Sequence, residues 1–270
     1  MPATAEATRV CYLYGVVRAD RVPRLDGIAG VGEAPVSFIV SDGLAAVVTD
    51  VARRDFIPLD PEHEDTRWLE RTVRAHESVL ERCLEPGPVL PMRFATTVRD
   101  DADVRALLRD HEAEFIASLE RLLGHREWGV KALLSDPEAL AQHVLEVRGD
   151  LNARERELAA RSPGAAYLAR KRLDHEIAIV ADELSAELVH RAHRRLADTA
   201  VDACLLSDSQ PRAERVHLNA AYLVAEADEA AFEGAVAELD HEHAELGLHY
   251  ELTGPWPAYN FVPGTIGAAW

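Results

Sequence analysis

Residues 128–138, with the sequence WGVKALLSDPE, join an apolar run to the beginning of a helix. Trp128–Leu134 alternates at first and then becomes continuously apolar, which is typical of a strand. Ser135-Asp136 supplies an N-cap, and Pro137 follows at the first helical position. The segment therefore predicts a strand that leads directly into a helix.

The helical pattern that begins at Pro137 extends far along the chain. Apolar residues recur at helical spacing as far as Leu158, and Ser162-Pro163-Gly164 then interrupts the pattern. A longer helix is predicted from about Ala165 to Asp198. Two helices joined by a short break predict an antiparallel helical hairpin over about 137–198, locally like a coiled coil.

Four further elements complete the second half of the chain. Val201–Leu206 and Arg215–Val224 predict strands, Glu226–His243 predicts a helix, and Leu248–Thr253 predicts a last strand. The order β-αα-β-β-α-β is the ferredoxin-like split βαβ plan, with its first helix expanded into a hairpin.

The first half of the chain follows a looser variant of this plan. Asp42-Gly43 between two apolar runs predicts a hairpin, and Pro91 places its own short strand at an edge or a bulge. We therefore expect an α+β protein with two domains, residues 1–125 and 126–270, and a boundary near 124–127. The predicted elements of the first half are strands at Val10–Val17, Val36–Val40, Leu44–Val48 and Val89–Phe94, a helix of about 20 residues ending before Pro86, and a helix from Asp101 to Leu123.

Composition excludes several classes of function. The chain has 270 residues, with 29 Lys and Arg against 47 Asp and Glu, which gives a formal net charge of −18. This charge argues against nucleic acid and anionic membranes as partners, because both would be repelled. The three cysteines form no CxxC pair, and neither a signal peptide nor a membrane-length apolar run is present. We therefore expect a cytoplasmic protein.

Chemical motifs are scarce. The chain has no GxSxG, no GxxxxGK[ST] and no GxGxxG pattern, and no carboxylate is isolated in an apolar run where its pKa would rise. We expect no catalytic residue, no metal and no cofactor. The alternative is a small-molecule-binding or metal-dependent enzyme or sensor on a ferredoxin-like scaffold, which would use the region 240–243.

The histidines offer the candidates for that alternative. Asp240-His241-Glu242-His243, with His249 beyond it, suits either a metal site or the polar end of a helix. Helical positions i and i+2 point about 200° apart, which favours the helix end. His190 and His193 fit a basic patch or a solvated helix end. His76 lies on an apolar helical face and is interpreted as a core or interface histidine.

The segment Gly254-Pro255-Trp256-Pro257-Ala258-Tyr259-Asn260-Phe261 has no equally simple interpretation. Its two prolines stiffen the chain and are expected to stop it from pairing as a regular strand. Three aromatic side chains are then presented on a rigid strip. The strip either covers an edge of the protein's own core or forms a docking surface for an apolar partner, and both can hold.

Three segments resemble the GvpF/GvpL family of gas vesicle proteins. They are Tyr12-Leu13-Tyr14-Gly15-Val16-Val17, Val89-Leu90-Pro91-Met92-Arg93-Phe94 and the strip from Gly254 to Phe261, and their order and spacing fit. Two departures are visible: Ala95 stands where the family has glycine, and Ala258 stands where a second proline is common. Both departures concern local turn geometry.

The resemblance implies a non-enzymatic accessory or minor structural protein with a two-domain α+β fold. Such a protein binds the hydrophobic shell subunit, supports nucleation or assembly of gas vesicles and lies at the gas-facing surface; other accessory proteins are further partners. The motifs are shared by F-type and L-type proteins. The implied partner contacts are Met92, Arg93, Phe94, Trp256, Tyr259, Asn260 and Phe261, and the implied structural residues are Tyr12, Tyr14, Gly15, Pro91, Gly254, Pro255 and Pro257.

Overall fold

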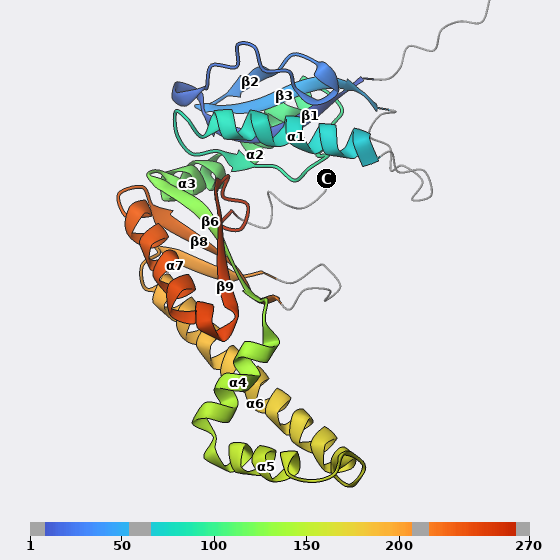
Figure 1. The fold of residues 1–270 in the computed structure, drawn as a ribbon. Helices are drawn as coiled ribbons and strands as arrows, with labels where there is room; N and C mark the ends of the chain where they lie inside the picture. The colour runs from blue at the N-terminus through green and yellow to red at the C-terminus, as the bar shows by residue number, and fades with distance from the viewer. Residues whose placement is uncertain (1–8, 54–65, 207–215, 263–270) are drawn as a thin grey trace, which may run out of the picture. The chain divides into compact units, whose positions relative to one another are not determined.

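The computed structural model describes residues 9–53, 66–206 and 216–262, and the chain divides into two compact units (Figure 1). Unit 1 consists of Met1–Glu127 together with Trp256–Trp270, and unit 2 consists of Trp128–Pro255. Residues 256–262 therefore belong with the first half of the chain, whereas the sequence predicted them in the second domain. The reason is that their side chains pack and form hydrogen bonds within unit 1.

Unit 1 is built on an antiparallel sheet whose central strand, β1, is almost wholly buried. The strand order is β2-β3-β1-β4, and β5 also pairs with β1. The predicted hairpin is present, with Asp42 and Gly43 at φ 46° and 82°, as a tight hairpin turn requires. The strands are β1 (Arg9–Arg18), β2 (Ser37–Ser41), β3 (Leu44–Ala52), β4 (Leu90–Pro91) and β5 (Thr97–Val98).

Strand β4 is shorter than the predicted Val89–Phe94. Pro91 lies at the edge of the strand order, as its missing N–H predicts. The Met92 N–H then donates to the Tyr14 carbonyl at 2.8 Å. Ala95 adopts φ 65°, so the chain turns there and returns to β1 as strand β5.

The helices of unit 1 are α1 (Thr66–Cys83), α2 (Asp101–Asp110) and α3 (Glu112–Leu122). Asp100 caps α2 by accepting from the N–H groups of Ala102 and Asp103. The single helix predicted over Asp101–Leu123 is wrong, because His111 leaves helical geometry at φ −116°, ψ 16°. His111 becomes the N-cap residue of α3, and its ring contacts the Glu114 carboxylate at 3.1 Å.

Unit 2 has the predicted order of elements, with a four-stranded sheet in the order β7-β8-β6-β9. Asp136 caps α4, and Pro137 stands at its first position, as predicted. The predicted start of the third strand, Arg215, lies outside the described residues. The elements are β6 (His125–Leu134), α4 (Pro137–Val147), α5 (Gly149–Ala159), α6 (Pro163–Ala197), β7 (Asp202–Leu205), β8 (Val216–Ala225), α7 (Glu229–His243) and β9 (Leu248–Trp256).

Two predictions for this half are wrong in detail. The helix predicted from Pro137 to Leu158 is two helices, because Arg148 breaks helical geometry at φ −102°, ψ 84°. Strand β9 continues through Pro255 to Trp256, although the prolines were expected to stop it. It lies at the edge of the sheet, where a residue without an N–H group is tolerated.

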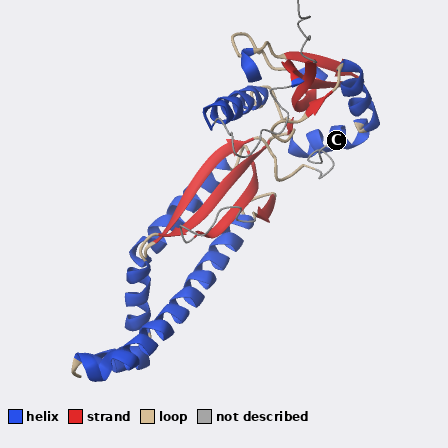
Figure 2. Cartoon of the chain, turned by 90° about the vertical axis from the view of Figure 1, so that its right-hand side faces the viewer, coloured by secondary structure: helices blue, strands red, loops and turns tan. Residues whose placement is uncertain are grey.

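The helices α4 and α5 and the first half of α6 extend past the end of this sheet, and we call them the helical arm (Figure 2). Ion pairs between Arg154 and Glu176 and between Arg170 and Glu155 join α5 to α6. The second half of α6 packs on β8, where Leu188, Ala192 and Leu196 enter the core. No helix among the described residues is long and apolar enough to cross a bilayer.

Candidate functional site

The three predicted motif segments meet in unit 1 around His76 of α1, which is 1% exposed. Tyr12 and Tyr14 come from β1, Phe94 follows β4, and Tyr259 comes from the C-terminal strip. The His76 ring lies 5.7 Å from the Tyr12 ring, 5.6 Å from the Tyr14 ring and 5.9 Å from the Phe94 ring. We call these five residues the His76 cluster.

Local structure explains why these side chains converge. Tyr12 and Tyr14 bring their rings to 4.9 Å from each other on β1, where the pairing with β3 shifts register between Leu13 and Gly15. His76 shares the buried face of α1 with Val79, Leu80 and other core residues. The interpretation of His76 as a satisfied core histidine is confirmed, since both ring nitrogens have hydrogen-bond partners.

The hydrogen bonds of the cluster run in one direction. The Ala95 N–H donates to Tyr12 Oη at 3.1 Å, and Tyr12 Oη lies 2.9 Å from His76 Nδ1. Because Tyr259 donates its own proton to Glu77, the tautomer that fits has the ring proton on His76 Nε2, which donates to Tyr259 Oη at 3.1 Å, and His76 Nδ1 then accepts from Tyr12. Tyr259 in turn donates to Glu77 Oε1 at 3.2 Å.

Burial keeps the cluster in this protonation state. Desolvation lowers the pKa of His76 to about 4, so the imidazole is neutral at neutral pH. Desolvation also raises the pKa values of Tyr12 and Tyr259, and the nearby Glu77 carboxylate raises that of Tyr259 further. The pKa of Glu77 is raised by burial as well, although the hydrogen bond from Tyr259 opposes this change.

A second buried carboxylate, Glu127, binds the strip at Asn260, the residue that follows Tyr259. The Asn260 N–H donates to Glu127 Oε2 at 2.9 Å, and Asn260 Nδ2 donates to Glu127 Oε1 at 2.6 Å. Phe261 follows with 6% exposure, and its carbonyl accepts from Arg121 Nη1 at 3.4 Å. Three successive residues, Tyr259, Asn260 and Phe261, therefore fasten the strip to unit 1.

Two glycines allow close packing around β1 and Tyr14. A Cβ on Gly15 would lie 2.7 Å from the Leu90 carbonyl oxygen, so β4 could not pack so closely against β1. A Cβ on Gly30 would lie 2.5 Å from Tyr14 Oη, which accepts from the Val31 N–H at 2.7 Å. Tyr14 and Gly15, which the resemblance marks as structural residues, therefore both make close contacts inside unit 1.

The predicted partner contacts divide by exposure. Met92 and Phe261 are buried at 1% and 6%, so these two do not present a surface to a partner in this conformation. At Phe261 the strip covers the core of unit 1. Phe94 and Tyr259 are partly buried, whereas Arg93, Asn260 and Trp256 are exposed, Trp256 by 37%.

The remaining motif residues lie along the same strip. Gly254 has φ 121°, a conformation that favours glycine, and Pro255 continues the strand β9. Pro257 is buried, and Ala258, the small residue that replaces a common proline, is 5% exposed. Ala95, the other departure, has the positive φ that glycine would adopt without strain.

Two carboxylates of this site were not predicted. Glu77 is one of 47 acidic residues and has no distinguishing neighbours in the sequence. Burial raises the pKa of Glu127, which is only 4% exposed, although this carboxylate does not stand in an apolar run of the sequence, the pattern that was searched for. Its burial depends on Asn260, 133 positions away, and no local pattern could have indicated it.

The histidines of unit 2 join helices to strands. Asp240 accepts from the Tyr250 N–H at 2.9 Å and lies 3.2 Å from His249 Nδ1. His243 Nδ1 lies 3.0 Å from Tyr250 Oη, and His193 Nδ1 lies 2.7 Å from Tyr222 Oη. Within the described part of the chain, no three His, Cys, Asp or Glu side chains are close enough to hold a metal ion.

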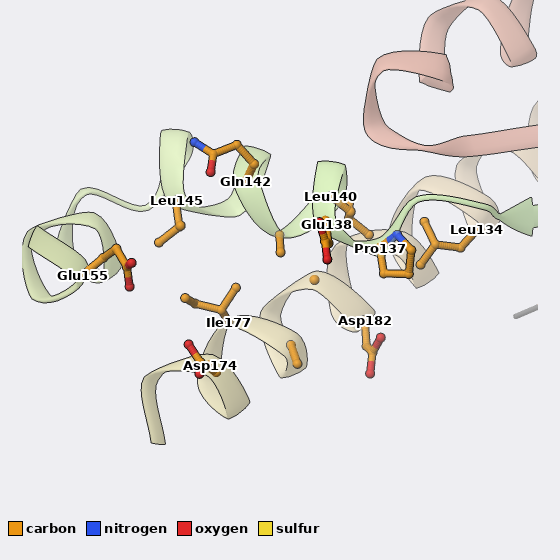
Figure 3. Close-up of a pocket in the computed structure, with 13 residues that line it drawn as sticks. Leu134, Pro137, Glu138, Leu140, Gln142, Leu145, Glu155, Asp174, Ile177 and Asp182 are labelled. Atoms are coloured by element: carbon orange, nitrogen blue, oxygen red, sulfur yellow. The ribbon is translucent and has the colours of Figure 1, made fainter. Parts of the chain in front are cut away.

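A second candidate site is a groove of about 350 Å³ between α4 and α6 (Figure 3). Leu140, Leu145 and Ile177 point into it from the two facing helices. The polar residues that line the groove are mainly carboxylates. These are Glu138, Glu155, Asp174 and Asp182.

Comparison with known proteins gives consistent results over almost the whole chain. Residues 10–263 match the model of the family described as gas vesicle synthesis protein GvpL/GvpF. Gas vesicle protein L of Streptomyces sp. (strain CB03234) is 35% identical, covering 94% of this chain and 93% of its own length. Gas vesicle protein F of the same strain is 30% identical, covering 93% and 98%.

Solved structures show the same fold. The crystal structure of the gas vesicle protein GvpF from Anabaena sp. PCC7120 matches with a TM-score of 0.70 and 22% identity, covering 94% of this chain and 98% of that one. GvpF from Microcystis aeruginosa matches with a TM-score of 0.64 and 21% identity, covering 93% and 98%.

Proposed function

Since the chain belongs to the GvpL/GvpF family of gas vesicle synthesis proteins, we propose that it binds the hydrophobic shell subunit and supports nucleation or assembly of the vesicle. The family match over residues 10–263 is the observation that carries this proposal. The family is one of gas vesicle proteins and not of enzymes, and its members act in gas vesicle formation.

The chemistry of the shell subunit explains why such a protein is needed. A shell subunit exposes a large apolar face before it polymerises, and exposed apolar faces aggregate. An acidic protein with a net charge of −18 would keep a complex with that subunit in solution. Binding would be transient, because the same face must afterwards enter the shell.

The proposed contact consists of the exposed residues of the second and third motif segments. Trp256 is 37% exposed, and Phe94 and Tyr259 are partly exposed, whereas Arg93 and Asn260 provide a polar border. Tryptophan and arginine are frequent among the residues that dominate binding energy at interfaces. Met92 and Phe261 would support this surface from below, since both are buried.

Co-purification with a tagged shell subunit tests the proposal. Trp256→Ala is expected to weaken recovery, with a loss of about 30-fold in affinity if Trp256 is central to the contact. Tyr167→Ala in the helical arm removes another exposed aromatic side chain and is expected to leave recovery unchanged. Thermal unfolding of both variants checks that each is folded. Failure of the wild-type protein to bind the subunit would contradict the proposal.

We also propose a location for the protein in the vesicle and further binding partners. We place the protein at the gas-facing surface of the vesicle and expect it to bind other accessory proteins during growth. Immunolabelling of intact and collapsed vesicles measures the first point, since only collapsed vesicles would expose a gas-facing protein.

A further inference from the structure

The groove of the helical arm combines an apolar floor with negative charge. Among the described residues, no lysine or arginine lines it. Glu155 is paired with Arg170 of the same chain, but Glu138, Asp174 and Asp182 have no ion pair within the described part of the chain. An occupant of this groove would therefore carry both apolar surface and positive charge.

The beginning of α6 has this complementary chemistry. The first ten residues of α6, residues 163–172, hold Arg170, Lys171 and Arg172 and no acidic residue, in a chain that is strongly acidic. Tyr167 and Leu168 are 57% and 70% exposed. The ammonium group of Lys171 lies 5.6 Å from the centre of the Tyr167 ring, so charge and apolar surface are adjacent.

The basic segment and the groove lie along one stripe of α6. Tyr167, Lys171, Asp174, Ala178 and Asp182 follow one another at spacings of four, three, four and four residues, which places them on the same side of the helix. We call these five residues the α6 stripe. The last three line the groove. The stripe is thus positive towards its N-terminal end and negative towards its C-terminal end.

We propose that a second copy of the chain docks antiparallel on the α6 stripe. Lys171 of each copy would cross the small Ala178 of the other copy. Its side chain leans towards the N-terminus of its own helix, which brings the ammonium group to Asp182 of the second copy. The ends of the arrangement are self-complementary, as a two-fold interface requires, because Lys171 meets Asp182 and Asp182 meets Lys171, whereas the two Asp174 carboxylates face each other near the axis and oppose the association.

Tyr167 gives this contact its apolar part. In the same register it lies against Asp182 of the second copy, at the end of the groove that Leu134 and Pro137 also line. Burial of the exposed ring there would supply association energy that the ion pairs alone do not, since exposed ion pairs contribute little. The proposal is independent of shell binding, and either can fail without the other.

Charge exchange within the stripe tests the proposal. Sedimentation equilibrium over a range of concentrations would be measured for the wild-type protein, Lys171→Glu, Asp182→Lys and the double variant. We expect a dimer for the wild type and a dissociation constant raised about tenfold by each single change, because each creates two like-charge pairs in a symmetric interface. The double variant restores opposite charges and is expected to recover most of the affinity.

Neighbouring residues of equal charge provide matched controls. Arg172→Glu and Glu183→Lys make the same charge changes about 100° further around the exposed side of α6, and both are expected to leave the dimer unchanged. A monomeric wild type at every concentration would overturn the proposal, even if the shell subunit then protected the groove from hydrogen exchange. An Arg172→Glu effect equal to that of Lys171→Glu, or a double variant weaker than both single variants, would overturn it as well.

Discussion

His76 uses its two ring nitrogens in opposite ways. Nδ1 accepts from Tyr12, whose hydroxyl already accepts from the Ala95 N–H, and Nε2 donates to Tyr259. A second proton on Nδ1 would leave the Tyr12 proton without this acceptor and would place a charge in a buried site. The chain of hydrogen bonds that reaches the strip therefore depends on a neutral imidazole.

This dependence predicts a loss of stability in mild acid. The pKa of His76 is about 4 in the folded protein, below its ordinary value of 6.5, so the unfolded chain takes up the proton first. The stability is fully present above pH 6.5 and falls towards pH 4, by about 2 kcal/mol between pH 7 and pH 5. Urea unfolding of the wild type and His76→Gln at both pH values measures this difference.

Comparing the wild type with His76→Gln separates the titration of His76 from that of the nearby carboxylates. The pKa values of Glu77 and Glu127 are raised by burial, so their contributions increase as the pH falls and have the opposite sign. Both carboxylates remain in both proteins and largely cancel. An equal pH dependence in the wild type and His76→Gln would show that the imidazole does not carry the effect.

Single residues also show the limits of prediction from sequence. Tyr12, Tyr14 and Gly15 could be singled out because a family motif marks them. The roles of Glu77 and Glu127 could not, because an acidic residue in an acidic chain has no local signal. Their partners, Tyr259 and Asn260, are distant in sequence, and only the folded chain brings them together.

At the scale of elements, the approach of β4 to β1 is controlled by Gly15. Gly15→Ala would place its Cβ 2.7 Å from the Leu90 carbonyl oxygen and 2.8 Å from Val89 Cγ2. We expect a loss of about 1–3 kcal/mol in the free energy of unfolding, the usual range for overpacking a core. Urea unfolding at constant pH measures it.

Gly234 in α7 provides the matched control for this change. A Cβ at this position would have no atom within 4 Å. Gly234→Ala is therefore expected to stabilise the helix by up to about 1 kcal/mol. Similar destabilisation by both substitutions would show that the close contact with β4 is not the cause.

Most elements could be predicted from periodicity, and their interruptions could not. The breaks at His111 and Arg148 occur at residues that do not disrupt helices by themselves. Strand β4 ends after Pro91, and the backbone then turns at Ala95 before strand β5 begins. Strand β9 is longer than predicted because its position at the edge of the sheet, which is a tertiary property, tolerates Pro255.

At the scale of the whole molecule, unit 1 is composed of two distant parts of the chain. Removing residues 256–270 is expected to destabilise it by several kcal/mol, since the loss of a buried phenylalanine alone costs about 3–5 kcal/mol. Hydrogen exchange of the β1 amides measures the effect.

Adding residues 256–270 back as a peptide distinguishes the loss of their specific contacts from non-specific unfolding of the shortened protein. A synthetic peptide of residues 256–270 is expected to restore protection of β1 in the shortened protein. The same peptide with Tyr259→Ala and Phe261→Ala is expected to have no effect. Equal protection with either peptide, or full protection without one, would contradict the assigned role of the strip.

The pairing of Glu127 with Asn260 also determines when unit 1 can be completed in the cell. The two residues are 133 positions apart, and all of unit 2 is translated between them. At usual rates of synthesis this interval is on the order of ten seconds. A nascent chain therefore carries the Tyr12 and His76 side chains without their final cover until Phe261 has been synthesised and has left the ribosome, and a chaperone bound near β1 would have at least that interval in which to act.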